Sequence, residues 1–248
     1  MDTKTTILKV SFNRLTHQAA LDTLIGFLQK DNNHLIVTPN PEALMLAQRD
    51  EGFLHILQNA DLVLPDGIGI FLAAKWQKLL TPNRPALPAR VPGCDITMAL
   101  LATAKNHSCY LLGAAPGVAE RARDNLKRQG VTVIGAHDGY FDEEKEKMII
   151  DEICALKPDI LLVGMGMPKQ EEWCAKHLNR LPCKITLCIG GTIDIIAENV
   201  SRAPKFMRRL GLEWLYRLIT DPRRIRRMLD LPRFVWAVFT EPKHTFPL

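Results

Sequence analysis

The chain has 248 residues, of which 47% are hydrophobic and 24% charged, and its formal net charge is +5. This composition is typical of a globular protein and excludes a disordered or fibrous chain. No apolar run approaches the roughly 18 residues of a membrane-spanning helix, and the first residues lack the pattern of an export signal, so we expect a cytoplasmic protein.

Short apolar segments alternate with longer amphipathic segments along most of the chain. The short segments are typical of buried strands, and the longer ones have the spacing of helices. Strands that alternate with helices predict an α/β fold, with a mostly parallel, Rossmann-like sheet that carries helices on both faces. In chain order we expect helix 17–30, strand 34–37, helix 41–59, strand 62–64, helix 67–78, a Pro-rich loop, a helix from about residue 95, strand 109–112, helix 117–129, strand 131–134, helix 142–156, strand 160–163, helix 169–179 and strand 185–189.

The alternation stops near Ala203. After this point a proline stands at or near the start of each helical segment, where its missing N–H does no harm. Three short helices are therefore expected, over residues 204–220, 222–230 and 232–239.

We accordingly divide the chain into an α/β domain, residues 1–202, and a C-terminal helical appendage, residues 203–248. Residues 202–248 hold 11 Lys and Arg against 4 Asp and Glu, whereas residues 1–201 hold 21 against 23. Such localised positive charge predicts an anionic partner: phosphate, nucleic acid or acidic lipid.

Polar residues and glycines follow the predicted strands. Ligands of open parallel sheets bind beyond the carboxyl ends of the strands, and small residues there let backbone N–H groups approach a phosphate closely. Neither Gly67-Ile68-Gly69 nor Gly164-Met165-Gly166 continues as G-x-G-x-x-G, and no Walker A sequence is present. An NAD enzyme or P-loop protein is thus disfavoured, and a mononucleotide ligand such as UDP stays open. The strand-end segments are TPNPE (38–42), PDG (65–67), GAAPG (113–117), GMGMPKQ (164–170) and GGTID (190–194).

Several of these residues have both a structural and a functional interpretation. Asp66 and Asn40 each precede a predicted helix, which either of them would cap. Asp66 is equally suited to act as a general base toward a sugar hydroxyl. Arg84 and Arg90 in the Pro-rich loop are either solvated or partners of a phosphate. Tyr140 is either a core aromatic, which its position favours, or a stacking face for a base.

The sequence predicts no metal or cofactor. Its six cysteines are scattered without a C-x-x-C pair, which indicates reduced cysteines that pack in the core rather than a zinc site. No D-x-D pair follows a predicted strand, so the divalent-cation anchor common in nucleotide-sugar transferases is not expected.

Several strings occur in one order over nearly the whole chain: VTPNPEALMLAQRD, ADLVLPDGIGI, RVPGCDITM, YLLGAAPGVAE, GYFDEE, GMGMPKQEEW, GGTIDIIAENVSRAP and GLEWLYRLITDPRRIRRM. Together they resemble the TagA/WecG/CpsF family of bacterial glycosyltransferases. The resemblance implies a metal-independent, inverting transferase with a Rossmann-like core, for which residues 1–202 are the catalytic domain. The implied reaction moves N-acetylmannosamine from UDP-N-acetylmannosamine to N-acetylglucosamine on undecaprenyl diphosphate, in the synthesis of a cell-surface polysaccharide such as teichoic acid. It also implies a peripheral position on the inner, anionic face of the cytoplasmic membrane.

The resemblance further implies roles for single residues. Asp66 in the PDG segment matches the base proposed for the family, with Thr38, Asn40 and Arg90 as catalytic residues beside it. Arg217, Arg224 and Arg227 match arginines proposed to face the diphosphate. With the strand-end glycines and Tyr140, the expected substrate-binding residues are Gly113, Tyr140, Gln170, Gly190, Gly191, Asp194, Arg217, Arg224 and Arg227.

Two alternatives stay open. In the first alternative the family is the same, but the donor is UDP-N-acetylmannosaminuronate or another UDP-hexose. An extra positive group near C6 of the donor would favour the uronate. In another class, the chain is a non-enzymatic nucleotide- or nucleic-acid-binding protein that uses the basic appendage. That interpretation leaves the polar strand ends unexplained, and no nucleic-acid motif is present, so we expect no nucleic acid partner. The oligomeric state is left open, a homo-oligomer included.

Overall fold

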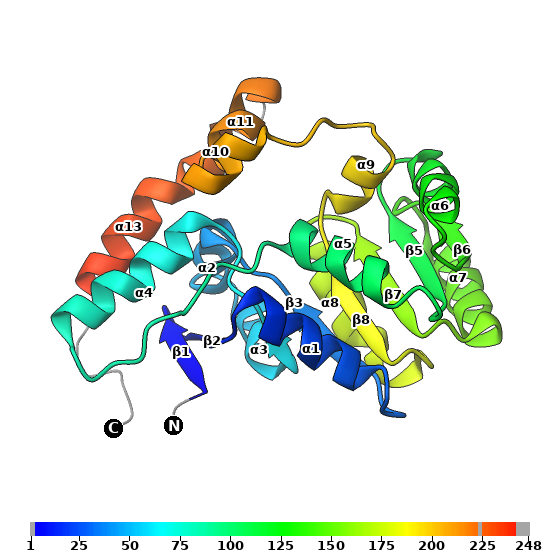
Figure 1. The fold of residues 1–248 in the computed structure, drawn as a ribbon, viewed down its shortest axis with the longest axis horizontal. Coiled ribbons are helices and arrows are strands. Elements are labelled where there is room, and N and C mark those ends of the chain that lie inside the picture. Colours follow the sequence, from blue (N-terminus) through cyan, green and yellow to red (C-terminus); the bar gives the residue numbers. More distant parts are fainter. Residues whose placement is uncertain (1–2, 223–224, 242–248) are drawn as a thin grey trace.

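The computed structural model describes residues 3–222 and 225–241 and has a six-stranded parallel sheet at its centre (Figure 1). The strand order is β4-β3-β8-β7-β5-β6, and every pairing is parallel. This confirms the predicted α/β fold. The strands are β3 (His34–Val37), β4 (Leu62–Val63), β5 (Cys109–Gly113), β6 (Val133–His137), β7 (Ile160–Gly164) and β8 (Ile185–Cys188).

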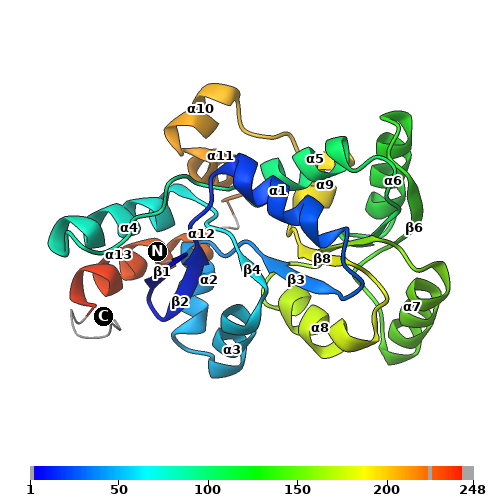
Figure 2. The same cartoon turned by 60° about the horizontal axis from the view of Figure 1, so that its bottom comes forward.

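Alternate residues of the central strands pack into two separate cores, because successive side chains point to opposite faces of a sheet. On β7, Leu161 and Val163 belong to one core, whereas Ile160 and Leu162 belong to the other. Figure 2 shows α1, α5 and α9 above the sheet and α3, α7 and α8 below it. The helices of this α/β part are α1 (His17–Phe27), α2 (Pro41–Ala47), α3 (Glu51–Asn59), α4 (Ile68–Leu80), α5 (Gly93–Thr103), α6 (Val118–Arg128), α7 (Glu143–Leu156), α8 (Lys169–His177) and α9 (Thr192–Ile196).

An N-terminal hairpin, which we did not predict, lies against the edge of the sheet. β1 (Lys4–Ile7) pairs with β2 (Val10–Asn13) in antiparallel register. The backbone N–H of Val63 donates to the side-chain oxygen of Asn13 at 2.9 Å, so the hairpin also satisfies the edge strand β4. Leu8 and Lys9 form the turn with positive φ angles of 46° and 68°. The usual Asn-Gly or Asp-Gly signal of such a turn is absent from the sequence.

Two stretches that we predicted as continuous helices are each divided into two helices at a single residue. The stretch 41–59 is divided into α2 and α3, because the side chain of Asp50 accepts a hydrogen bond from the N–H of Phe53 at 2.9 Å and starts a new helix. The stretch 204–220 is divided at Gly211, whose φ of 75° ends the preceding helix. The two resulting helices are α10 (Lys205–Leu210) and α11 (Glu213–Thr220).

The last described helices return to the α/β part of the molecule. They are α12 (Ile225–Met228) and α13 (Asp230–Thr240), and Pro232 lies in the first turn of α13. Figure 1 shows α13 beside α4, and Phe234, which is 3% exposed, belongs to the same core as residues of α2 and α4. Arg49 of α2 pairs with Asp230 at 3.0 Å. The division of the chain at residue 202 stays a prediction.

No helix within the described ranges combines the length and the apolar character that crossing a membrane requires.

Candidate active site

A cleft of about 1330 Å³ lies where the carboxyl ends of β3, β4, β7 and β8 face the C-terminal helices. Its sheet side is formed by the segments after these strands and by the start of α5, and its other side by α10, α11 and α13. Most of the strand-end segments named from the sequence therefore meet at one opening. Six of the expected site residues with described side chains line it, together with the two glycines of the GGTID segment: Thr38, Asn40, Asp66, Arg90, Gln170, Gly190, Gly191 and Arg217.

Asp66 is the half-buried carboxylate in this cleft. Burial raises its pKa to about 6, although the positive charge of Arg217 and hydrogen bonds from the backbones of Gly93 and Gly67 act in the opposite direction. The N-cap of α4 is Gly67, with a φ of 85°, so Asp66 does not cap the helix that follows it. A carboxyl group with a pKa near 6 is ionised at neutral pH and is still basic enough to accept a proton.

Thr38 and Asn40 follow β3 on either side of Pro39, whose carbonyl oxygen accepts a hydrogen bond from the N–H of Asp66 at 3.3 Å. The side-chain oxygen of Asn40 accepts a hydrogen bond from the N–H of Ala43 at 3.0 Å, which makes Asn40 the N-cap of α2 as well as a residue of the cleft wall. A Cβ atom added to Gly93 would lie 2.7 Å from the hydroxyl oxygen of Thr38. Glycine at position 93 therefore lets α5 begin directly against Thr38.

Arg90 connects the Pro-rich loop to the appendage. Its guanidinium donates to the carbonyl oxygens of Arg208 at 3.2 Å and Arg209 at 3.4 Å, at the C-terminal end of α10. Cations are favourable at this end of a helix, where carbonyl groups lack partners within the helix. Arg84 in the same loop instead donates to the carbonyl of Thr6 in β1. Of these two loop arginines, only Arg90 lines the cleft.

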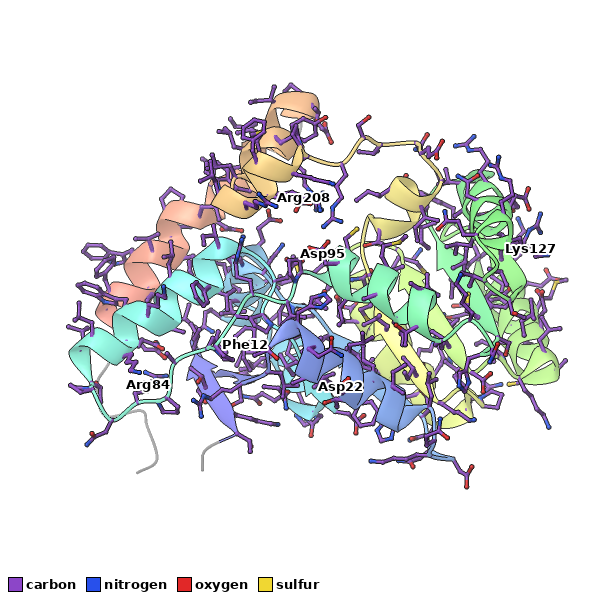
Figure 3. All side chains as sticks on the ribbon, in the orientation of Figure 1. Phe12, Asp22, Arg84, Asp95, Lys127 and Arg208 are labelled. Atoms are coloured by element: carbon purple, nitrogen blue, oxygen red, sulfur yellow. The ribbon has the colours of Figure 1, made fainter. Side chains whose placement is uncertain are left out.

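The appendage brings further basic side chains to the opening. Arg217 pairs with Glu213 one helical turn earlier at 2.6 Å. Lys205, Arg208 and Arg209 also line the cleft, although from the sequence we expected them only to contribute to the positive charge of the appendage. Figure 3 shows Arg208 pointing from the appendage toward Asp95 of α5, and the two side chains are 3.6 Å apart. Arg224 lies outside the described residues, as does the side chain of Arg227.

Gln170 holds the glycine loop that follows β8. Its side-chain oxygen accepts from the N–H of Gly190 at 3.0 Å, and its side-chain nitrogen donates to Glu171 at 2.7 Å. Glu171 is only 6% exposed and lines the cleft, and burial raises its pKa to about 7. Glu171 was not among the predicted site residues, although it directly follows Gln170 of the PKQ segment.

Three expected site residues lie outside the lining of the cleft. Gly113 packs against the backbone of Gly164, where a Cβ would lie 2.4 Å from the carbonyl oxygen. Tyr140 is 70% exposed, so the core position that we favoured for it is wrong. The carboxylate of Asp194 accepts from the side chain of Asn199 at 3.0 Å. Their contribution to substrate binding stays a prediction.

The cysteines of the described residues form no disulfide, although the sulfur atoms of Cys174 and Cys188 lie 3.7 Å apart in the core. The six cysteines are free, and five of them are buried, as expected for packing residues. Groups of three or more His, Cys, Asp or Glu side chains placed to hold a metal ion are not found in residues 3–222 and 225–241.

Comparison with known proteins identifies relatives over almost the whole length. The sequence profile described as the glycosyl transferase WecG/TagA/CpsF family matches residues 5–246. The chain is 36% identical over 216 residues to a protein of Bacillus spizizenii named N-acetylglucosaminyldiphosphoundecaprenol N-acetyl-beta-D-mannosaminyltransferase, and the match covers 86% of this chain and 81% of the relative. A protein of Staphylococcus aureus with the same name is 35% identical over 240 residues, covering 95% of this chain and 92% of the relative.

Proposed function

The chain belongs to the WecG/TagA/CpsF family of glycosyl transferases, and on this premise we propose that it is an N-acetylmannosaminyl transferase. In this proposal the sugar moves from a UDP donor to an N-acetylglucosamine that is carried by undecaprenyl diphosphate. The single observation that carries the proposal is the cleft that joins Asp66 to the basic side chains of the appendage. The acceptor and the transferred sugar are those in the names of the two relatives. The product would serve in building a cell-surface polysaccharide such as teichoic acid.

Asp66 is the base in this proposal. Glycosyl transfer requires the acceptor hydroxyl to lose a proton as it attacks the anomeric carbon, and a positioned carboxylate takes up that proton. The raised pKa of about 6 suits this task. The names of the relatives specify a beta-linked sugar, and attack from the face opposite an α-linked UDP produces that configuration by inversion.

The basic residues of the cleft balance the charge of the departing UDP. As the bond to the sugar breaks, negative charge grows on the diphosphate, and fixed positive groups stabilise that charge without reorganising. Arg217, Arg208, Arg209 and Lys205 surround the opening, and Arg90 holds α10 in place. These side chains provide the positive charge that a divalent ion supplies in other transferases, so we propose a metal-independent reaction.

The appendage also supports a position on the membrane surface. Exposed apolar side chains extend along α10 and α11, including Phe206, Leu210 and Ile219, and basic residues stand between them. Apolar and basic side chains on one helical surface favour binding to an anionic lipid interface. We propose that this surface rests on the inner face of the membrane, where the lipid-linked acceptor is presented.

A transfer assay tests the proposal. The purified chain is incubated with a lipid-linked N-acetylglucosaminyl diphosphate and, in separate reactions, UDP-N-acetylmannosamine, UDP-N-acetylmannosaminuronate or UDP-N-acetylglucosamine. We expect UDP release and a product larger by one N-acetylhexosamine with UDP-N-acetylmannosamine, at a rate well above that with the other donors. Faster transfer from the uronate would reassign the donor, and no transfer from any of them would contradict the proposal.

A further inference from the structure

The cleft has an apolar arm that the reaction at Asp66 does not use. From Gly67 onward one face of α4 lines the cleft, with Gly69, Leu72, Ala73 and Trp76 at successive turns. At the rise of about 1.5 Å per residue of a helix, the wall from Gly67 to Trp76 is roughly 14 Å long. The cleft therefore continues well beyond the catalytic carboxylate.

The second wall of this arm is α13. Its residues Leu231, Phe234, Val235, Val238 and Phe239 line the cleft with the spacing of one helical face. Side chains that point inward are buried, whereas Val235 is 50% and Phe239 54% exposed. Leu72 on the opposite wall is 54% exposed. The arm is therefore a groove with a buried floor and half-exposed apolar rims.

Contacts at both ends hold the two walls beside each other. A Cβ added to Gly69 would lie 3.5 Å from the ring of Phe234, and the rings of Trp76 and Phe239 are 4.5 Å apart. The helices therefore run in the same direction, away from Asp66. Beyond the rings, Gln77 of α4 donates to Glu241, which also accepts from the N–H of Leu8.

We propose that this groove, defined by Leu72, Ala73, Trp76, Leu231, Val235 and Phe239, binds the first isoprene units of the lipid attached to the acceptor diphosphate. The inference rests on the proposed function, because only a lipid-linked acceptor places an apolar chain next to a diphosphate. The polar end of the cleft, with Arg217 and Arg208, suits the diphosphate, and the groove starts beside it. A branched hydrocarbon chain gains affinity by leaving water for such a surface.

The location of the groove distinguishes it from a surface that merely rests on a membrane. Leu79 of α4 and Trp236 of α13 are each 72% exposed, which makes them more exposed than the groove residues, and neither lines the cleft. Both helices thus carry one set of apolar residues facing the groove and another facing outward. The two sets provide matched variants on the same elements.

Calorimetric titration with farnesyl diphosphate, kept below its micelle concentration, tests the inference against inorganic diphosphate. We expect the full chain to bind farnesyl diphosphate at least about tenfold more tightly. The variant Leu72→Gln with Val235→Gln should lose most of this preference and keep the affinity for UDP. The control Leu79→Gln with Trp236→Gln should retain it.

Equal affinity of the wild-type chain for the two diphosphates would overturn the proposal. Loss of the preference in the control as well as in the groove variant would also overturn it, since apolar adsorption would then explain the binding. Because the titration requires neither donor nor turnover, it separates the two proposals. A chain that prefers farnesyl diphosphate but transfers no sugar would contradict the proposed function alone, and active transfer without the preference would contradict the groove alone.

Discussion

At the scale of single residues, the site depends on how burial changes the acidity of Asp66. Removing the carboxylate from water disfavours its charged form, and Glu213 acts in the same direction, while Arg217 opposes both. The result is a pKa of about 6 instead of the ordinary 3.8. Two measurements, one of rate and one of stability, follow from this shift.

The rate of transfer should depend on pH through Asp66. The base must be ionised to accept a proton, so kcat/KM should rise with pH and reach half of its maximum near pH 6. Glu171 also lines the cleft and has a raised pKa of about 7, so Glu171→Gln is the matched control and should leave the midpoint near 6. A midpoint near 4 in the wild-type chain would show that Asp66 is not the titrating base.

The raised pKa of Asp66 should also make thermal stability depend on pH, and here ionisation of Asp66 lowers stability, whereas it raises the rate of transfer. The folded chain binds the Asp66 proton more tightly than the unfolded chain does, so the stability cost of ionisation is absent below about pH 4 and complete above about pH 6. Asp66→Asn is neutral at every pH. We expect it to raise the unfolding temperature by a few degrees at pH 7.5 and to leave it unchanged at pH 4. A variant less stable than the wild-type chain at pH 7.5 would contradict the shift.

The sequence identified many individual residues of the cleft but not all of their partners. Thr38, Asn40 and Asp66 follow strands and were found by position, because parallel strands present their carboxyl ends at one edge. Glu171 was missed because its burial depends on how α8 packs, and the local sequence does not determine that packing. Whether Arg208 faces the cleft or solvent likewise depends on how α10 packs against α5, where Arg208 pairs with Asp95 at 3.6 Å.

At the scale of elements, α13 joins the appendage to the α/β part of the molecule. Phe234 is 3% exposed and packs in the core formed with α2 and α4, whereas Phe239 is 54% exposed. Phe234→Ala should lower the free energy of unfolding by about 3 to 5 kcal/mol, the usual cost of deleting a buried phenylalanine ring. Phe239→Ala, the control on the same helix, should cost clearly less. Denaturant unfolding compares them, and equal small losses would indicate that α13 is not docked.

The strands were easier to predict than the ends of the helices. Apolar runs buried on both faces identify central strands regardless of context, and all six predicted strands are present. The ends of helices depend on single capping residues. Asp50, for example, starts α3 within a stretch whose apolar spacing predicts one continuous helix. β6 begins at Val133 because the N–H of Val131 still bonds to Leu126, closing α6. The hairpin turn at Leu8 and Lys9 lacks the residues that usually indicate one.

At the scale of the whole molecule, the carboxyl ends of the strands place Asp66 in the cleft and the appendage places basic side chains there, so neither part forms the complete cleft. Figure 1 shows α10, α11 and α13 extending along one side of the molecule from the end of the sheet, beside α4. Arg90 and the pair of Arg49 with Asp230 hold this arrangement from the α/β side. On the proposed mechanism, we therefore expect sugar transfer to require the appendage in its docked position.

Chelation tests whether protein charge alone stabilises the leaving diphosphate. Because Arg217, Arg208, Arg209 and Lys205 already line the cleft, turnover should be unchanged in EDTA. The assay measures UDP release with and without the chelator, at a fixed ionic strength, since added salt weakens charge interactions. Loss of turnover in EDTA that magnesium or manganese restores would contradict the metal-independent scheme.

The central claim, that this cleft transfers a sugar with Asp66 as its base, is tested most directly by the turnover of Asp66→Asn measured together with its affinity for UDP. We expect kcat to fall by about 10² to 10⁴, because general-base assistance is commonly of this size. The dissociation constant for UDP should stay within about threefold of that of the wild-type chain, since we propose that other residues contact the diphosphate. Turnover near that of the wild-type chain, with UDP binding intact, would contradict the claim.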